Sequence, residues 1–193
     1  MSETAARGIL TSLRQSDVDP ITRLMGRQAF IACLEDRVAR ARREVVRFGV
    51  AIVDLDEFKK FNLSHGLTCG DAALRGVAEQ LVRTNSTPRA DAARYDGNAF
   101  AMLLESASAE ELSRSAHALH GAVAKFRTTE GLALSASIGV AHARIGETAE
   151  AILMRAEQTL YLAKQFGRNR VEISASAAPL RVDGSVVALR RSA

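Results

Sequence analysis

The sequence predicts an α/β fold in which helices surround a mixed central sheet. Two kinds of segment alternate along the chain and support this prediction. Short, nearly unbroken apolar runs, of which 48–53 is the clearest, are typical of strands buried on both faces. Between them lie longer segments in which apolar residues recur every three or four positions, as they do in amphipathic helices. Since the chain has 193 residues, 47% of them hydrophobic, we expect one core and one domain.

The N-terminal part of the chain is expected to be mostly helical. Residues 1–16 are polar with a thin apolar stripe, which predicts a lead-in helix. The pair Asp19-Pro20 should end that helix and begin an ordered turn. From Phe30 to Val45, apolar residues at three- and four-residue steps predict an amphipathic helix.

A carboxylate stands at the end of the predicted strand 48–53. An unpaired carboxylate there is costly, so Asp54 should have a cation or a basic group beside it. The chain is then expected to turn through residues 62–70, a segment that contains two glycines. Asp71 follows this turn and is well placed to cap the next helix.

Residues 94–100 are predicted to form the tip of a β-hairpin. The pair Asp96-Gly97 favours a type I′ turn, because glycine adopts a positive φ without a Cβ clash. The apolar run 100–104 should leave the tip as a strand. The side chains around the tip are Asp96, an amide and a methyl group, so few carboxylates converge there.

The later elements are predicted in the order helix, strand, helix. Ser108 and Glu111 have the spacing of a capping box, ahead of a helix that continues to Phe126. A strand over 132–141 and a helix over 147–167, which Gly167 ends, should follow.

The C-terminal end should consist of a short edge strand and a tail. The strand is predicted over 171–173, so we place the folded domain over 17–173. The tail over 174–193 is rich in Ser and Ala. Its Asp183-Gly184 pair would suit a short hairpin, and the alternative is a disordered tail.

Composition excludes several classes of protein. No apolar run approaches the roughly 20 residues that span a bilayer, and the N-terminus lacks the apolar centre of a signal peptide, so we expect a soluble, cytoplasmic protein. Cys33 and Cys69 form no CxxC pair, and His117 and His120 lie without a third ligand, which argues against a zinc site. The net charge of +4 is spread among acids, so nucleic acid is not an expected partner.

Four separated motifs stand out in the sequence. In chain order they are Asp54-Leu55-Asp56-Glu57-Phe58-Lys59-Lys60-Phe61-Asn62, Gly70-Asp71, Ser137-Ile138-Gly139-Val140-Ala141 and Leu160-Tyr161-Leu162-Ala163-Lys164-Gln165-Phe166-Gly167-Arg168-Asn169-Arg170-Val171. Together they resemble the GGDEF family of diguanylate cyclases, and four motifs in this order are specific where one would be weak. The resemblance covers residues 17–173 and implies a nucleotide-cyclase or palm-like GGDEF fold. Members of this family condense two GTP molecules into cyclic di-GMP, with each domain of a dimer holding one GTP.

The resemblance implies a site with a metal half and a base half. Asp54 matches the first metal carboxylate, and the backbone carbonyl of Leu55 lies beside it, so Mg²⁺ arriving with GTP would be held there. Asn62 and Asp71 match the pair that reads the guanine edge. An amide both donates and accepts, and a carboxylate accepts from the ring N–H and the exocyclic amine of guanine. Taken alone, Asn62 would be a turn residue and Asp71 a helix cap.

Three cations match family positions that meet the triphosphate. They are Lys59, Lys164 and Arg168, and cations there would offset concentrated negative charge. Lys164 and Arg168 also flank the end of a predicted helix, where a cation favours the helix dipole without any ligand. Both interpretations stay open.

The family signature itself is altered. GG(D/E)EF corresponds here to Asp96-Gly97-Asn98-Ala99-Phe100, which keeps only the second glycine and the phenylalanine. Asn98 replaces the second metal carboxylate and offers only a neutral oxygen, so Mg²⁺ should be held weakly. Ala99 lacks the fourth carboxylate, and Asp96 puts an anion where phosphate should approach the backbone. We therefore expect no intact catalytic set.

Three hypotheses follow for the function. The first is a degenerate GGDEF domain that acts as a regulatory module in cyclic di-GMP-type signalling, binding a guanine nucleotide, GTP foremost, or a protein partner or second copy. The second is a slow cyclase, or a GTP hydrolase with Asp54, Asp56 and Asp96 as metal ligands. The third is an interaction scaffold that binds no nucleotide.

Leu63 and Leu67, where the family usually has Asp and His, alter the loop beside the guanine pair.

Overall fold

The computed structural model describes residues 17–41, 47–84, 91–106 and 108–174. The predicted lead-in helix over 1–16, the predicted helix end beyond residue 41 and the tail from residue 175 lie outside these residues. Within them, none of the helices combines the length and the apolar character that crossing a membrane requires.

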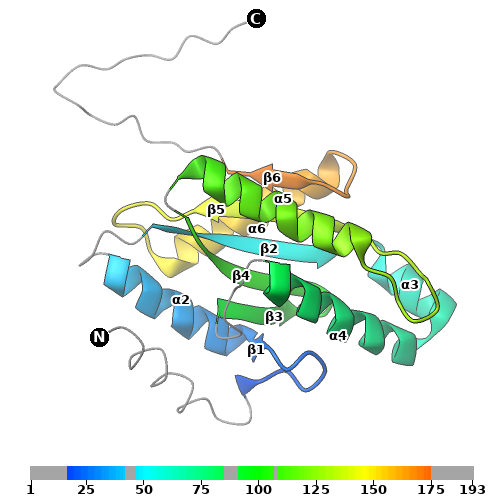
Figure 1. Ribbon diagram of the computed structural model, residues 1–193. Coiled ribbons are helices and arrows are strands. Elements are labelled where there is room, and N and C mark those ends of the chain that lie inside the picture. The colour runs from blue at the N-terminus through cyan, green and yellow to red at the C-terminus, as the bar shows by residue number, and fades with distance from the viewer. Residues whose placement is uncertain (1–16, 42–46, 85–90, 107, 175–193) are drawn as a thin grey trace, which may run out of the picture.

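A mixed sheet forms the centre of the molecule (Figure 1). Its strands are β1 (Met25–Gly26), β2 (Phe48–Leu55), β3 (Ala92–Asp96), β4 (Ala99–Glu105), β5 (Ala136–His142) and β6 (Val171–Ile173). They lie side by side in the order β1-β3-β4-β2-β5-β6. The pairings among β3, β4, β2 and β5 are antiparallel, whereas β1 with β3 and β5 with β6 are parallel. The predicted mixed sheet is confirmed.

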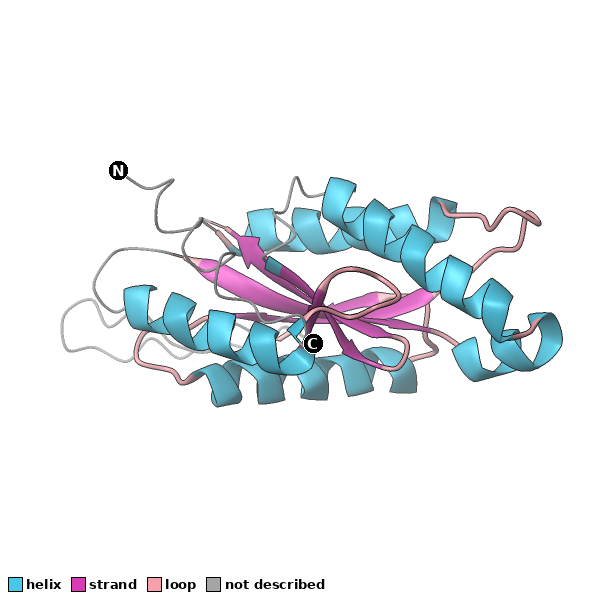
Figure 2. Cartoon of the chain, turned by 90° about the horizontal axis from the view of Figure 1, so that it is seen from below, coloured by secondary structure: helices cyan, strands magenta, loops and turns pink. Residues whose placement is uncertain are grey.

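Helices cover both faces of the sheet (Figure 2). They are α2 (Arg27–Ala41), α3 (Phe58–His65), α4 (Leu67–Thr84), α5 (Ala109–Lys125) and α6 (Ala149–Gln165). The buried residues of α4 and α5 pack on one face of the sheet, and those of α2 and α6 pack on the other. Each face therefore carries its own core, whereas the composition predicted one.

The central strand β2 is buried on both of its faces, which explains the unbroken apolar run that predicted it. Val53 and Leu55 belong to the core under α4 and α5, whereas Val50 and Ile52 belong to the core under α2 and α6. Since side chains alternate along a strand, Asp54 faces the α2 and α6 side. The fold thus brings this carboxylate to the C-terminal end of α6.

The predicted turn over 62–70 is wrong. Two helices, α3 and α4, meet there with only Gly66 between them, and Gly66 makes the corner with a φ of +83°. Asp71 therefore lies inside α4, which begins at Leu67, and does not cap it. Gly70 lies inside α4, and a glycine is needed there because an added Cβ would lie 2.0 Å from Asn62 Oδ1.

The predicted hairpin is confirmed, but its turn is shifted by one residue. Asp96 pairs with Ala99, so the two loop residues are Gly97 and Asn98 rather than Asp96 and Gly97. Of these two only Gly97 has a positive φ, +21°, so the turn is not type I′. The side chain of Asn98 is bonded to the end of β2, which holds this residue in its place in the turn.

The C-terminal half follows the predicted order. The Ser108 hydroxyl accepts a hydrogen bond from the Glu111 N–H at 3.2 Å, which confirms the cap of α5. β5 begins at Ala136 and not at 132, because the segment before it is joined only by one isolated bridge. Gly167 has a φ of +111° just beyond α6, as expected of a helix stop.

Candidate functional site

Asp54 and Lys164 meet at the end of β2. Helix α6 reaches this point because Gly139 on β5 has no side chain: an added Cβ would lie 2.1 Å from the backbone nitrogen of Leu160. One turn further along α6, Lys164 places its Nζ 2.9 Å from Oδ1 of Asp54, whose side chain is only 16% exposed. Asp54 therefore has the basic partner that a carboxylate at the end of a buried strand requires.

Asn98 contacts the same carboxylate from the hairpin tip. Its Nδ2 donates to the carbonyl oxygen of Leu55 at 2.7 Å and to Oδ1 of Asp54 at 3.2 Å. Both neighbours are pure acceptors, so the amide presents its NH₂ group to them and not its oxygen. The backbone carbonyl of Asn98 also accepts from the Leu55 N–H at 3.2 Å. The hairpin tip and the end of β2 are thus bonded through one side chain and one backbone group.

The Asp54 carboxyl is held in a setting that disfavours its charge. The pKa of Asp54 is raised above its ordinary value, chiefly by burial and also by the nearby charge of Asp56. The hydrogen bond and the charge of Lys164, and the hydrogen bond of Asn98, lower this pKa but do not cancel the rise. A carboxyl whose pKa is perturbed by burial and by a specific partner is a candidate for a functional role.

Asp56 anchors the loop that follows β2. It is 8% exposed, and its carboxylate accepts hydrogen bonds from Ser137 Oγ at 2.7 Å, Ser135 Oγ at 2.9 Å and the Asn169 N–H at 3.0 Å. The bonds join β2, the start of β5 and the segment after α6. The sequence signal for this anchor is the pair Ser135 and Ser137, which alternate with apolar residues in the predicted strand 132–141.

The cations near the end of β2 differ in whether an acidic side chain pairs with them. Glu57, at a left-handed φ of +53°, pairs with Lys60 and lies 3.6 Å from Nε of Arg168. Lys164 is engaged by Asp54. Lys59 is exposed and forms no ion pair with any other residue that the structure describes. Of the three predicted phosphate-binding cations, only Lys59 has no acidic partner.

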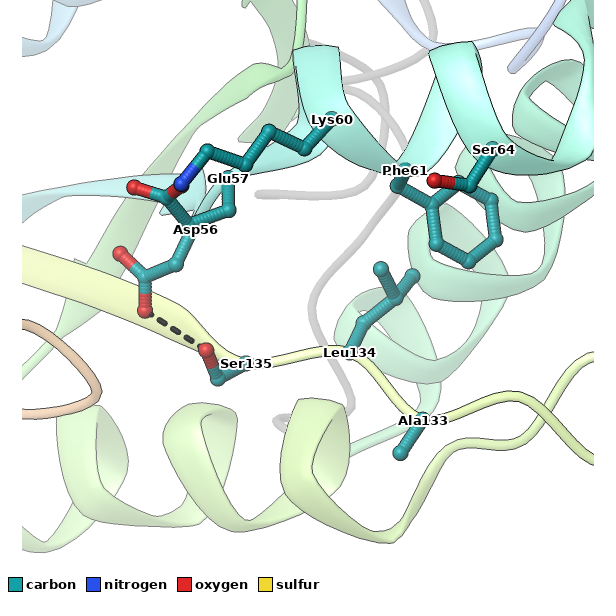
Figure 3. A pocket seen from close by; sticks show the side chains of 8 residues that line it. All are labelled: Asp56, Glu57, Lys60, Phe61, Ser64, Ala133, Leu134 and Ser135. Atoms are coloured by element: carbon teal, nitrogen blue, oxygen red, sulfur yellow. Dashed lines mark hydrogen bonds and ion pairs between the residues drawn. The ribbon is translucent and has the colours of Figure 1, made fainter.

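A pocket of about 310 Å³ lies between the residues that follow β2 and the segment 133–135 before β5 (Figure 3). Glu57 and Lys60 stand at one end, and the ring of Phe61 faces Leu134 at the other. Asp56 lines it while bonded to Ser135. Neither Asp54 nor Asn98 lines this pocket, so it is separate from the hairpin contact.

The two residues predicted to read the guanine edge lie at the corner between α3 and α4. Asn62 Oδ1 is buried against Gly70 and has no hydrogen-bond partner among the described residues. Asp71 follows Gly70 directly, so the corner brings the two predicted guanine-reading residues to adjoining helices. Leu63 and Leu67 lie on the same corner with 78% and 73% of their surfaces exposed.

Arg94 is a structural residue that sequence reasoning missed. Its Nε and Nη2 donate to the carbonyl of Gly97 at 2.9 and 2.7 Å, and its Nη1 lies 3.1 Å from Oδ2 of Asp19. The other oxygen of Asp19 accepts from the N–H and the hydroxyl of Thr22. Arg94 therefore joins the hairpin tip to the turn that opens the domain, a pairing across 75 residues that no local pattern could show.

The described residues do not fit a divalent metal at Asp54. Mg²⁺ requires several oxygen ligands and favours carboxylates. Here Oδ1 of Asp54 is bonded to Lys164 and Asn98, and the Leu55 carbonyl is bonded to Asn98. No three Asp, Glu, His or Cys side chains in the described ranges gather as metal ligands. The NH₂ group of Asn98 donates to the Asp54 carboxylate and the Leu55 carbonyl, the two groups that the resemblance assigns to a metal.

Known proteins similar to this chain include diguanylate cyclases. The family model described as "Diguanylate cyclase, GGDEF domain" matches residues 16–170. The chain is 33% identical over 166 residues to the diguanylate cyclase DosC of Escherichia coli K12, covering 84% of this chain and 36% of DosC. It is 34% identical over 160 residues to the diguanylate cyclase DgcP of Pseudomonas aeruginosa, covering 81% of this chain and 24% of DgcP. The chain thus spans about a third or less of the length of these relatives.

The fold also matches solved GGDEF domains. The GGDEF domain of DgcB from Caulobacter crescentus, solved in complex with c-di-GMP, is similar with a TM-score of 0.75 and 30% sequence identity. The match covers 83% of this chain and 97% of that domain, so the shared fold is nearly the whole of the solved domain. The chain therefore belongs to the GGDEF family, the domains of diguanylate cyclases in cyclic di-GMP signalling.

Proposed function

We propose that this chain is a degenerate GGDEF domain that binds a guanine nucleotide as a regulatory module and does not make cyclic di-GMP. The observation that carries the proposal is the Asn98 amide, which donates to both Asp54 and Leu55. The groups that would hold a metal are therefore already bonded to a side chain. Ala99, which is 7% exposed beside Asp54, brings no carboxylate in the fourth signature position.

The base half of the site supports nucleotide binding. Asn62 Oδ1 is buried against Gly70, which holds the amide of Asn62 at the corner between α3 and α4. A guanine edge carries both donors and acceptors and would satisfy the amide of Asn62 and the carboxylate of Asp71. Lys59, which has no ion pair within the described part of the chain, adds a cation that could meet a phosphate. GTP is the first nucleotide to test, and any Mg²⁺ that accompanies it is expected to be held weakly.

The catalytic part of the proposal is tested by product analysis. Purified protein is incubated with GTP and Mg²⁺ or Mn²⁺, and the products are separated by chromatography. We expect GTP to remain unchanged. Formation of cyclic di-GMP that Asp54→Ala abolishes would contradict the proposal.

The binding part is tested by a shift in melting temperature on addition of GTP. We expect the shift to be lost in Asn62→Ala and kept in Ser64→Ala, a matched control because Ser64 is exposed two positions further along α3. A shift that survives Asn62→Ala would place the nucleotide elsewhere.

The structure gives little support to a GTP hydrolase built on Asp54, Asp56 and Asp96. Such an enzyme needs Asp56 as a metal ligand, and its carboxylate is already bonded to two serines and a backbone N–H. An interaction scaffold remains the second candidate, and the exposed Leu63 and Leu67 favour it. A scaffold that binds no nucleotide predicts no melting shift in the unaltered chain.

A further inference from the structure

Building on the proposed function, we infer that this site takes its guanine nucleotide without a divalent metal and prefers a nucleotide with fewer phosphates than GTP. The inference names guanosine monophosphate as the class of ligand that fits best. It depends on the contacts of Asn98 and on which nearby cations are still free to meet a phosphate.

Asn98 supplies part of the positive charge that a metal ion would bring to Asp54 and Leu55. Its NH₂ group carries partial positive charge and is shared between the Leu55 carbonyl and Oδ1 of Asp54. A metal ion entering this place would have to break both of these hydrogen bonds and the 2.9 Å pairing of Lys164 with Asp54. The ion would then gain a single carboxylate in exchange for these three contacts.

Without a metal, the phosphates must be met by the protein's own cations, and most of these are engaged. Lys60 and Arg168 face Glu57, and Lys164 faces Asp54. Lys59 is the cation of this group that has no ion pair within the described residues. A site with one free cation suits one phosphate group better than three.

Freeing a second cation has a cost. Moving Lys164 to a phosphate would leave Asp54, whose side chain is 16% exposed, without its partner, and an uncompensated part-buried charge is strongly unfavourable. Asp96 adds to this barrier, because its exposed carboxylate lies at the hairpin tip and forms no ion pair with a described residue. Each added phosphate therefore meets more repulsion and no new cation.

Titration calorimetry of the full chain with guanosine, GMP, GDP and GTP tests the inference, first in EDTA and then with MgCl₂. In EDTA we expect GMP to bind at least about tenfold more tightly than GTP, a difference well within the resolution of the method. Addition of MgCl₂ should leave the GMP and GTP affinities unchanged within about twofold. Tightest binding by GTP with Mg²⁺ would overturn the inference and leave the proposed function standing. Absence of binding by all four ligands would instead overturn both.

Two variants at one position separate the metal argument from the charge argument. Asn98→Asp adds a second carboxylate beside Asp54, so we expect MgCl₂ to tighten GTP binding at least about tenfold. Asn98→Ala removes the amide without adding a ligand, and should give no such gain. If Asn98→Asp shows no dependence on Mg²⁺, or if Asn98→Ala gains it equally, Asn98 is not what excludes the metal and the inference is wrong.

Discussion

Asp19 and Asp54 are both part-buried carboxylates that face a cation, yet their pKa values move in opposite directions. Burial raises the pKa of Asp19, but the hydrogen bonds from Thr22 and the charge and hydrogen bond of Arg94 outweigh it, so the net direction is downward. At Asp54 burial outweighs Lys164 and Asn98, and Asp56 adds to the rise. Asp19 has two donors from Thr22 alone, at 2.7 and 2.8 Å, and no like charge among the groups that shift its pKa, whereas Asp54 has Asp56 nearby.

These opposite shifts predict opposite effects on stability. The folded state binds a proton at Asp54 more readily than the unfolded state does, so this group lowers the free energy of unfolding as the pH rises through its ordinary pKa of 3.8 toward the raised one. Asp19 stabilises the fold above its ordinary pKa of 3.8, and this contribution is lost as the pH falls through its lowered pKa. At pH 7 we therefore expect Asp54→Asn to raise the free energy of unfolding and Asp19→Asn to lower it.

Urea unfolding of both variants at pH 7 and at acid pH measures the two effects. The difference between each variant and the unaltered chain should shrink below the ordinary pKa, where both carboxyls become protonated in the unfolded state. Equal destabilisation by both substitutions at pH 7 would contradict this prediction for Asp54.

At the scale of elements, the sequence predicted what depends on local patterns and missed what depends on distant contacts. The run 48–53 predicted a buried strand because burial on both faces requires apolar residues throughout. The prediction of a turn over 62–70 was wrong because the sequence does not distinguish a glycine that makes a corner from one that is needed for packing. Only Gly66 makes the corner, whereas Gly70 is needed for its packing against Asn62. The type of residue at position 98 was visible, but the direction of its amide depends on two acceptors that the sheet brings to it.

The packing of α6 on β5 gives a prediction at this scale. Gly139→Ala would place a Cβ 2.1 Å from a backbone nitrogen of α6, which no side-chain rotation can relieve, so the helix must move away from the sheet. We expect a loss of about 1–3 kcal/mol in the free energy of unfolding, the usual cost of overpacking. Gly121→Ala in α5 is the control, because no atom lies within 4 Å of the added Cβ. It should stabilise the chain by about 0.5–1 kcal/mol through helix propensity.

Denaturant titration of the two glycine variants measures these changes in the free energy of unfolding. If Gly139→Ala is as stable as the unaltered chain, α6 does not depend on this close approach. The position of Lys164 beside Asp54 would then need another explanation. A destabilised Gly121→Ala would show that the α5 glycine has a contact of its own.

At the scale of the whole molecule, the hairpin tip is held by parts of the chain that are far apart in sequence. Arg94 bonds the tip to Asp19 in the opening turn, and Asn98 bonds it to the end of β2. Lys164 meets Asp54 at the same place from α6. The hairpin tip is therefore held in place, and under the proposed function the departures from the GGDEF signature are confined to three side chains at the tip.

This confinement predicts that activity can be restored by the triple variant Asp96→Gly, Asn98→Asp and Ala99→Glu, which rebuilds the GGDEF signature. With the metal carboxylates present, Mg²⁺ or Mn²⁺ should bind together with GTP and cyclic di-GMP should form. Because the product joins two GTP molecules that two copies of the domain hold, its rate per protein should rise with protein concentration. Chromatography over a dilution series measures this, and adding Asp54→Ala to the triple variant should abolish it. If the triple variant binds metal and GTP but forms no product at any concentration, the proposed lack of activity also involves the exposed Leu63 and Leu67, which lie at the corner with Asn62.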